Sequence, residues 1–174
     1  MQPAIRPALR RWSKTCLDVL LPRPCVLCGQ SADSDNLGAR CGAYLARPGH
    51  ACLSCALPLS GTDDPLCGPC LRRPPPWDRA LGALVYHYPV DRLVCRFKFR
   101  CDFSCGHLLG LEMLKAIRFA GLPLPDMLVP VPLHRKRHFS RTFNQADMLA
   151  RQLGRDLAIP VHSRLLSRQR PTRA

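Results

Sequence analysis

The chain has 174 residues, 47% of them hydrophobic and 6% aromatic, which allows a packed core but weakens any base-stacking platform. Lys and Arg number 26 against 12 Asp and Glu, and the net charge of +14 favours anionic partners such as nucleic acid, phosphorylated small molecules or acidic membrane. An Arg-rich coding bias of a high-GC genome is an equally good explanation of this excess. No segment is long and apolar enough for a transmembrane span and none is a convincing secretory signal, so we expect a cytoplasmic protein.

Four sections follow one another along the chain. Residues 1–21 are a basic lead segment, and residues 22–71 contain seven of the eleven cysteines. Residues 72–78 are a Pro-rich linker, and residues 79–174 have the pattern of a partial α/β domain. An odd number of cysteines with tight C-x-x-C pairs indicates metal binding rather than disulfides.

Cys52 and Cys55 form one C-x-x-C pair, and Cys67 and Cys70 form another after eleven intervening residues. Each pair can build a tight knuckle that directs two thiolates at one ion, and two knuckles complete a tetrahedral site. Four thiolates leave no open coordination position. We therefore predict a structural zinc at these four cysteines.

Cys25 and Cys28 form a further pair, and this half of the cysteine section is incomplete. We expect Cys41 to open its second knuckle, with Tyr44 standing where the last cysteine would be. His50 is the nearest substitute, and a Cys3His site is chemically sound. The alternative, that His50 is a surface loop residue and the site weak or empty, is favoured because nothing fixes the spacing. Pairing across the two halves also stays open.

Residues 79–174 alternate predicted strands and helices, which argues for a parallel sheet. The expected strands are Ala83–Tyr88 and Met127–Val131. A first helix begins at Pro89, with an apolar face that consists of Val90, Leu93, Val94 and Phe97.

Two further helices are expected after it. Ser104 caps one that runs to Phe119, with an inner stripe of Leu109, Met113, Ala116 and Ile117. Thr142 and Gln145 form a capping box for the other, with an inner face of Phe143, Ala146, Ala150 and Leu153.

A cation-rich loop follows the second expected strand. Val129–His134 leads into Arg135, Lys136, Arg137 and Arg141, and then into the helix start at Asn144 and Gln145. Backbone N–H groups at a helix start favour an anion, and arginine offers forked donors that match phosphate oxygens. We predict an anion site of Arg137, Arg141, Thr142, Asn144 and Gln145, and DNA contacts from Arg135, Lys136 and Arg137. A solvated basic loop is the alternative.

The order of these motifs resembles the ComF family. The cysteines resemble its double zinc ribbon, and Phe97–Arg100 resembles its Lys-Phe motif. Val129–His134 with Arg141–Gln145 resembles its Pro-Val-Pro-Leu-His … Arg-Gly-Phe-Asn-Gln signature, and residues 168–172 resemble its Arg-x-Arg-x-Thr stretch. The resemblance covers nearly the whole chain. It implies a phosphoribosyltransferase-like domain, a pyrophosphate as the loop's anion, a role in natural competence and DNA uptake, and single-stranded DNA and a competence helicase as partners.

Three departures from the family pattern stand out. Thr142 and Cys101 replace two family glycines, and the chain ends at Ala174 without the family's Asp-Asp … Thr-Thr-Gly loop. That loop holds the ribose and 5′-phosphate of phosphoribosyl pyrophosphate, so we expect this cofactor only in a full-length relative and no catalytic residues here. The alternatives are a non-enzymatic zinc-ribbon DNA-binding protein and a gene fragment without stable function.

Overall fold

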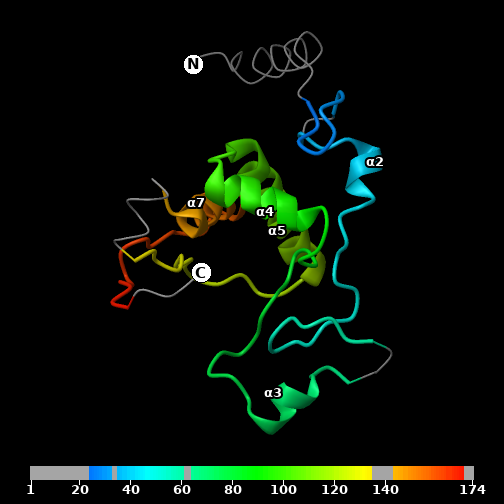
Figure 1. Cartoon of the computed structure of the whole chain (residues 1–174). Helices are drawn as coiled ribbons and strands as arrows, with labels where there is room; N and C mark the ends of the chain where they lie inside the picture. Colours follow the sequence, from blue (N-terminus) through cyan, green and yellow to red (C-terminus); the bar gives the residue numbers. More distant parts are fainter. Residues whose placement is uncertain (1–23, 33–34, 61–63, 135–142, 171–174) are drawn as a thin grey trace, which may run out of the picture. The chain divides into compact units, whose positions relative to one another are not determined.

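The computed structural model describes residues 24–32, 35–60, 64–134 and 143–170 (Figure 1). The chain divides into two compact units, Met1–Tyr44 and Leu45–Ala174. The first unit contains the short helix α2 (Ala39–Gly42). The second contains α3 (Gly68–Arg72), α4 (Val90–Phe99), α5 (Phe103–Ala120) and α7 (Gln145–Leu157). Within the described ranges, no helix combines the length and apolarity that crossing a bilayer requires.

Helix α5 is the centre of the second unit and packs against both α4 and α7. Two glycines allow this close approach. A Cβ on Gly106 would lie 2.4 Å from Cε2 of Phe97, and one on Gly110 would lie 2.4 Å from Oε1 of Gln152. Phe97 is almost fully buried, and its ring centroid lies 5.5 Å from that of Phe143, so the core continues to the start of α7.

Helix α4 agrees with the prediction, since it begins directly after Pro89 and buries Val90, Leu93 and Phe97. Val94 is only half-buried. The spacing of these residues follows the helical period, so the buried face of α4 could be predicted from the sequence alone.

Helix α5 corrects the prediction in two respects. Its N-cap is Asp102 rather than Ser104, because the Asp102 carboxylate accepts hydrogen bonds from the N–H groups of Ser104 and Cys105. The predicted inner stripe was also wrong, since the face with full burial includes Leu108 and Glu112. The residues of the predicted stripe, which are Leu109, Met113, Ala116 and Ile117, are half-buried.

Helix α7 also has a different cap from the one predicted. Oδ1 of Asn144 accepts a hydrogen bond from the N–H of Ala146 at 3.1 Å, which makes Asn144 the N-cap. Thr142 lies outside the described residues. Of the predicted inner face, Leu153 is buried, whereas Phe143, Ala146 and Ala150 are half-buried.

The predicted parallel sheet is not formed within the described ranges. Ala83–Tyr88 is irregular, so the strand prediction there was wrong: Val85 donates to the carbonyl of Ala46, and no neighbouring segment supplies a ladder. Met127–Val131 is reduced to one parallel bridge between Leu128 and Val161. Leu128 N–H donates to Pro160 and His162 N–H donates to Leu128, both at 2.9 Å. Because α7 connects these segments, they form a minimal extended–helix–extended unit.

The end of the Pro-rich segment contacts the Cys52–Cys55 pair, which belongs to the same unit. Nε1 of Trp77 donates to the carbonyl of Ser54 at 2.7 Å, and the N–H of Ala80 donates to the carbonyl of Leu53 at 3.0 Å. The division of the chain into a 22–71 ribbon, a 72–78 linker and a 79–174 domain stays a prediction. These two bonds join Trp77, near the end of the linker, and Ala80, just after it, to the Cys52–Cys55 knuckle.

Candidate functional site

Cys52, Cys55, Cys67 and Cys70 form a compact group whose four sulfur atoms all lie within 4.8 Å of one another. Cys67 is the N-cap of α3, and this helix carries Cys70 one turn further on. The N–H of Cys67 points at Sγ of Cys52, 3.3 Å away. Four sulfur donors at this spacing could hold a metal ion, and the donor set is the one that closed tetrahedral zinc sites use.

The four thiols hold their protons unequally. Burial raises the pKa of Cys52, but hydrogen bonds from the backbone N–H groups of Cys67, Cys55 and Ser54 outweigh it and lower this pKa to about 6. A hydrogen bond with Cys67, aided by burial, raises the pKa of Cys70 to about 12. A bound cation deprotonates its thiol ligands, so a metal would turn the whole group into thiolates.

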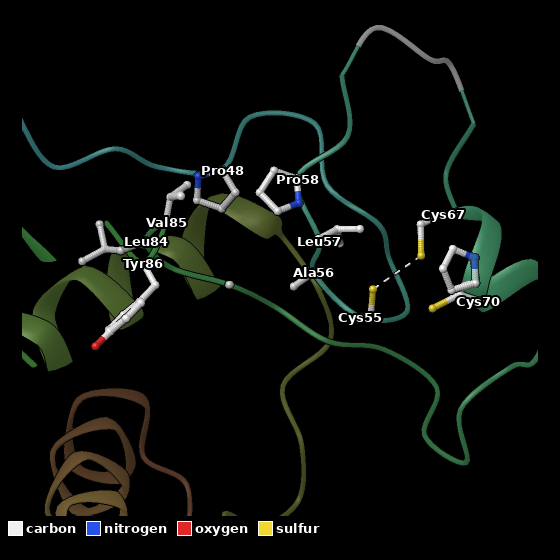
Figure 2. Close-up of a pocket in the computed structure, with 12 residues that line it drawn as sticks. Pro48, Cys55, Ala56, Leu57, Pro58, Cys67, Cys70, Leu84, Val85 and Tyr86 are labelled. Atoms are coloured by element: carbon white, nitrogen blue, oxygen red, sulfur yellow. Dashed lines mark hydrogen bonds between the residues drawn. The ribbon is translucent and has the colours of Figure 1, made fainter. Parts of the chain in front are cut away.

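An apolar recess of about 520 Å³ lies beside this group. Figure 2 shows Cys55, Cys67 and Cys70 at one end of the recess and Leu84, Val85 and Tyr86 at the other. The dashed line marks the 3.7 Å contact between Sγ of Cys55 and Sγ of Cys67. Apolar walls strengthen charge interactions, which favours a cation among thiolates.

The second cysteine group along the chain consists of Cys52, Cys55, Cys67 and Cys70. The first cysteine group consists of Cys25, Cys28 and Cys41, and its sulfur atoms also lie within 4.8 Å of one another. Its Cys25–Cys28 knuckle repeats the Cys52–Cys55 knuckle bond for bond. The N–H of Cys25 donates to the backbone carbonyl of Gln30 at 2.7 Å, and the N–H of Cys52 donates to the backbone carbonyl of Leu57 at 2.8 Å. Four residues after the start of each knuckle, the N–H of Gly29 donates to the carbonyl of Cys25, and the N–H of Ala56 donates to the carbonyl of Cys52, both at 2.8 Å. Gly29 and Ala56 share a left-handed backbone, with φ of 75° and 61°.

The hydrogen bonds that follow each knuckle align the rest of the two groups. Val26 N–H donates to Asn36 at 3.0 Å, as Leu53 N–H donates to Pro65 at 2.9 Å. Two residues later come the N-caps of α2 and α3, which are Gly38 (φ −69°, ψ 145°) and Cys67 (φ −75°, ψ 156°). Cys41 follows Gly38 by three residues, as Cys70 follows Cys67.

This alignment corrects the prediction for the first half. Cys41 is the counterpart of Cys70 and therefore closes its knuckle, and Gly38 occupies the place of the missing cysteine. Tyr44 lies beyond the group, with 70% of its surface exposed. The thiol pKa values show the same pattern as in the other group. Burial raises the pKa of Cys25, but hydrogen bonds from backbone N–H groups, first that of Gly38, outweigh it and lower this pKa to about 7. A hydrogen bond with Cys28 raises the pKa of Cys41 to about 11.

Each group takes its cysteines from one half of the section, so the described residues give no pairing across the halves. No histidine joins either group in the part of the chain that the structure describes. The carbonyl of His50 accepts a hydrogen bond from Leu59 at 2.9 Å in the second unit, beside the knuckle of Cys52.

The predicted anion and DNA site is described only at its edges. Arg135, Lys136, Arg137, Arg141 and Thr142 lie outside the described residues. Nδ2 of Asn144 donates to the carbonyl of Val131 at 3.1 Å, which fixes the start of α7 to the end of the segment Met127–Val131. Gln145 is buried, and its Nε2 has no hydrogen-bond partner among the described residues.

Sequence reasoning missed a buried carboxylate on α5. Glu112 is 1% exposed, and it lines a pocket of about 850 Å³. Nη2 of Arg47 lies 2.6 Å from its Oε2, and Nζ of Lys115 lies 3.0 Å from its Oε1. The Lys115 spacing is readable from a helix, but Arg47 is 65 residues away and gives no local signal.

Comparison with known proteins finds relatives by sequence, whereas no family model and no solved structure matches. The chain is 36% identical over 158 residues to the DNA utilization protein YhgH of Salmonella typhi, which covers 87% of this chain and 69% of that protein. It is 41% identical over 125 residues to YhgH of Escherichia coli K12, covering 70% of this chain and 55% of that protein.

A third relative carries the competence name. The chain is 38% identical over 112 residues to competence protein F of Haemophilus influenzae, which covers 61% of this chain and 48% of that protein. The chain thus spans between about half and two thirds of the length of these curated relatives. With this identity over most of its length, and with the cysteine groups and the Val129–His134 motif in family order, the chain belongs to the ComF family.

Proposed function

We propose that this protein handles DNA in natural competence, with a structural zinc in the second cysteine group and a basic loop that contacts phosphates. The names of the relatives, DNA utilization protein and competence protein F, support the DNA assignment. The net charge of +14 supports an anionic partner, because a polyanion releases counterions when cations neutralise its phosphates.

The bond between Asn144 and Val131 is the observation that carries the proposal. It holds the two flanks of the cationic loop together, since Nδ2 of Asn144 and the carbonyl oxygen of Val131 are 3.1 Å apart. The sequence between them contains Arg135, Lys136, Arg137 and Arg141. The described flanks of this segment thus meet at a helix start, where backbone N–H groups favour an anion.

The charges around the start of α7 leave this site open to an anion. Asp147 is in the first turn, but its Oδ2 binds Nε of Arg151 at 2.8 Å and its Oδ1 binds Ser163. This pairing reduces the repulsion that a carboxylate would exert on a phosphate. Gln145 adds a buried side-chain donor at the first helical residue.

The phosphoribosyltransferase-like nature of residues 79–174 is part of the same proposal. The parallel bridge between Leu128 and Val161, with α7 connecting the two segments, supports it. In such a topology, ligands bind beyond the carboxyl end of the first segment, which is where the cationic loop begins.

The test is single-stranded DNA binding by the full chain over a range of salt concentrations, with Arg135, Lys136 and Arg137 replaced by Ala. Each lost phosphate contact on a single strand lowers the log–log salt slope by about 0.7, so the triple variant is expected to lose about two units. Few aromatic residues predict equal affinity for polypyrimidine and mixed strands.

A matched control changes the same net charge elsewhere. The exposed cations for this control are Arg92 on α4, Arg118 on α5 and Arg155 on α7. Replacing all three by Ala is expected to lower the log–log salt slope by less than half as much as the loop variant does. Equal slopes for the parent and the loop variant would refute the loop as the DNA contact. Equal losses in both variants would show that charge composition, not the loop, causes binding.

A further inference from the structure

We propose that the first cysteine group is an open metal site, in which Cys25, Cys28 and Cys41 bind one Zn²⁺ and an exchangeable ligand from solution fills the corner beside Gly38. The donor set does not fit a closed four-thiolate site, because Gly38 supplies no side chain. The inference concerns metal coordination only, so it does not depend on DNA binding.

The position of the open corner follows from the repeat within the chain. In the second group, the side chain of Cys67 projects from the N-cap of its helix and brings its Sγ within 4.8 Å of the other three sulfurs. Gly38 has the same backbone conformation at the N-cap of α2. The first group therefore keeps the backbone of a complete site and lacks one sulfur.

Gly38 has space for the Cβ of a side chain. A Cβ on Gly38 would meet only the carbonyl oxygen of Ser31 within 4 Å, at an ordinary contact distance of 3.8 Å. The φ of −69° at Gly38 is open to any L-residue, so the glycine is not required by the backbone. Among the described residues, no His, Asp or Glu joins the three cysteines.

Three thiolates and one open position give the coordination chemistry. Sites with three protein ligands keep a water or another exogenous ligand in the fourth position. Thiolates make Zn²⁺ a soft centre, so a small thiol is the preferred replacement for water. In that exchange the Zn–O bond breaks, a Zn–S bond forms, and the thiol proton passes to solvent.

The experiment compares metal retention in the full chain with its Gly38→Cys and Tyr44→Cys variants. Loaded protein is titrated with a chelator, and the bound metal is counted by native mass spectrometry. We expect the parent to keep one zinc and release the other early. Gly38→Cys is expected to raise the affinity of the weaker site by about 100-fold, since one of four ligands carries at least that share of zinc-finger affinity.

Tyr44→Cys is the matched control, because it adds the same thiol in the same unit, at the position beyond the group. It is expected to release zinc as the parent does. A parent with two equally retained zinc ions would overturn the open corner, as would equal gains from both variants. Absence of any second zinc in the parent would overturn the site itself.

Cobalt gives a readout that does not depend on how Gly38→Cys folds. With both sites loaded with Co²⁺, 2-mercaptoethanol is expected to raise the thiolate-to-cobalt absorbance of the parent, because one Co–S bond is added. Cys41→Ser, which removes a ligand of the first group only, is expected to lose the weaker site and this response while the second group keeps its metal. An unchanged parent spectrum in the presence of the thiol contradicts the exchangeable ligand.

Discussion

Replacing Gly106 by Ala tests the packing that holds α4 against α5. The added Cβ would lie 2.4 Å from Cε2, 2.8 Å from Cδ2 and 2.9 Å from Cζ of the Phe97 ring. That ring is 2% exposed and packs against Phe143, so it has little room to move. Overpacking of this kind costs about 1 to 3 kcal/mol, whereas the helix propensity of Ala returns about 1 kcal/mol. We expect a net loss of up to about 2 kcal/mol in the free energy of unfolding.

A double-mutant cycle separates the two contributions. Phe97→Val removes all three ring atoms that the new Cβ would meet, so in that background only the propensity gain is left. Gly106→Ala is then expected to stabilise the protein by up to about 1 kcal/mol, which is a change of sign. Equilibrium unfolding in urea, followed by circular dichroism, measures all four proteins.

The control and the refuting result are both direct. Gly49→Ala adds the same methyl group where nothing lies within 4 Å, and it is expected to change stability by less than about 0.5 kcal/mol. If Gly106→Ala has the same effect in the presence and absence of the Phe97 ring, the ring does not limit the approach of the two helices, and the packing argument fails.

Three further predictions concern the N-cap of α5, the backbone strain at Cys101 and the enzymatic activity of the chain. Asp102→Asn keeps an N-cap but loses the ion pair with Arg96. Burial raises the pKa of Asp102, but the hydrogen bonds with Arg96 and Cys105 outweigh it and hold this pKa below its usual value. The ion pair therefore stabilises the folded protein above about pH 4. The difference in Tm between parent and variant should therefore vanish as pH falls through the folded pKa, and a constant difference down to pH 2 would contradict this. Cys101→Gly, at φ 53°, should raise stability by about 0.5 to 1 kcal/mol in thermal unfolding, whereas Cys95→Gly inside α4 should lower it by about as much. The 174-residue chain, which contains no Asp-Asp followed by Thr-Thr-Gly, should release no pyrophosphate from phosphoribosyl pyrophosphate, because the basic loop alone cannot orient the ribose; release that Arg141→Ala abolishes would refute this.

Local patterns predicted the parts of the fold whose stabilising contacts are themselves local. The apolar period of α4 was sufficient because Val90, Leu93 and Phe97 all lie on one face. The inner face of α5 was not predictable in this way, since Glu112 occupies it. A carboxylate is normally assigned to solvent, and the burial of Glu112 is compensated by two cations, Lys115 on its own helix and the distant Arg47.

The predicted strands failed for a related reason. A strand forms through hydrogen bonds to a neighbour, and a run of apolar residues does not contain that neighbour. Ala83–Tyr88 is apolar enough for a strand, yet in the described structure Val85 finds only one backbone acceptor, on Ala46. Leu128 forms one isolated parallel bridge with Val161, and the described residues contain no parallel sheet.

The cysteine groups separate what spacing can tell from what it cannot. Two cysteines at C-x-x-C spacing identify each other, and the structure brings Cys52, Cys55, Cys67 and Cys70 into one group as predicted. Cys41 has no such companion, so the sequence could not say whether it begins or ends its knuckle. The answer lies in the N-cap of α2, because a bond from Val26 to Asn36 fixes Gly38 where the other repeat has its cysteine.

The two cysteine groups also belong to different units of the chain. The second group belongs to the unit that contains α4, α5 and α7, and Trp77 and Arg47 connect its surroundings to the linker and to Glu112. A zinc closed by four thiolates would hold the Cys52–Cys55 knuckle, to which Trp77 of the linker is bonded. The first group belongs to a unit of its own that contains only α2 among the described helices. The proposed exchange of a ligand would therefore take place in a different unit from the one that contains the buried residue Phe97.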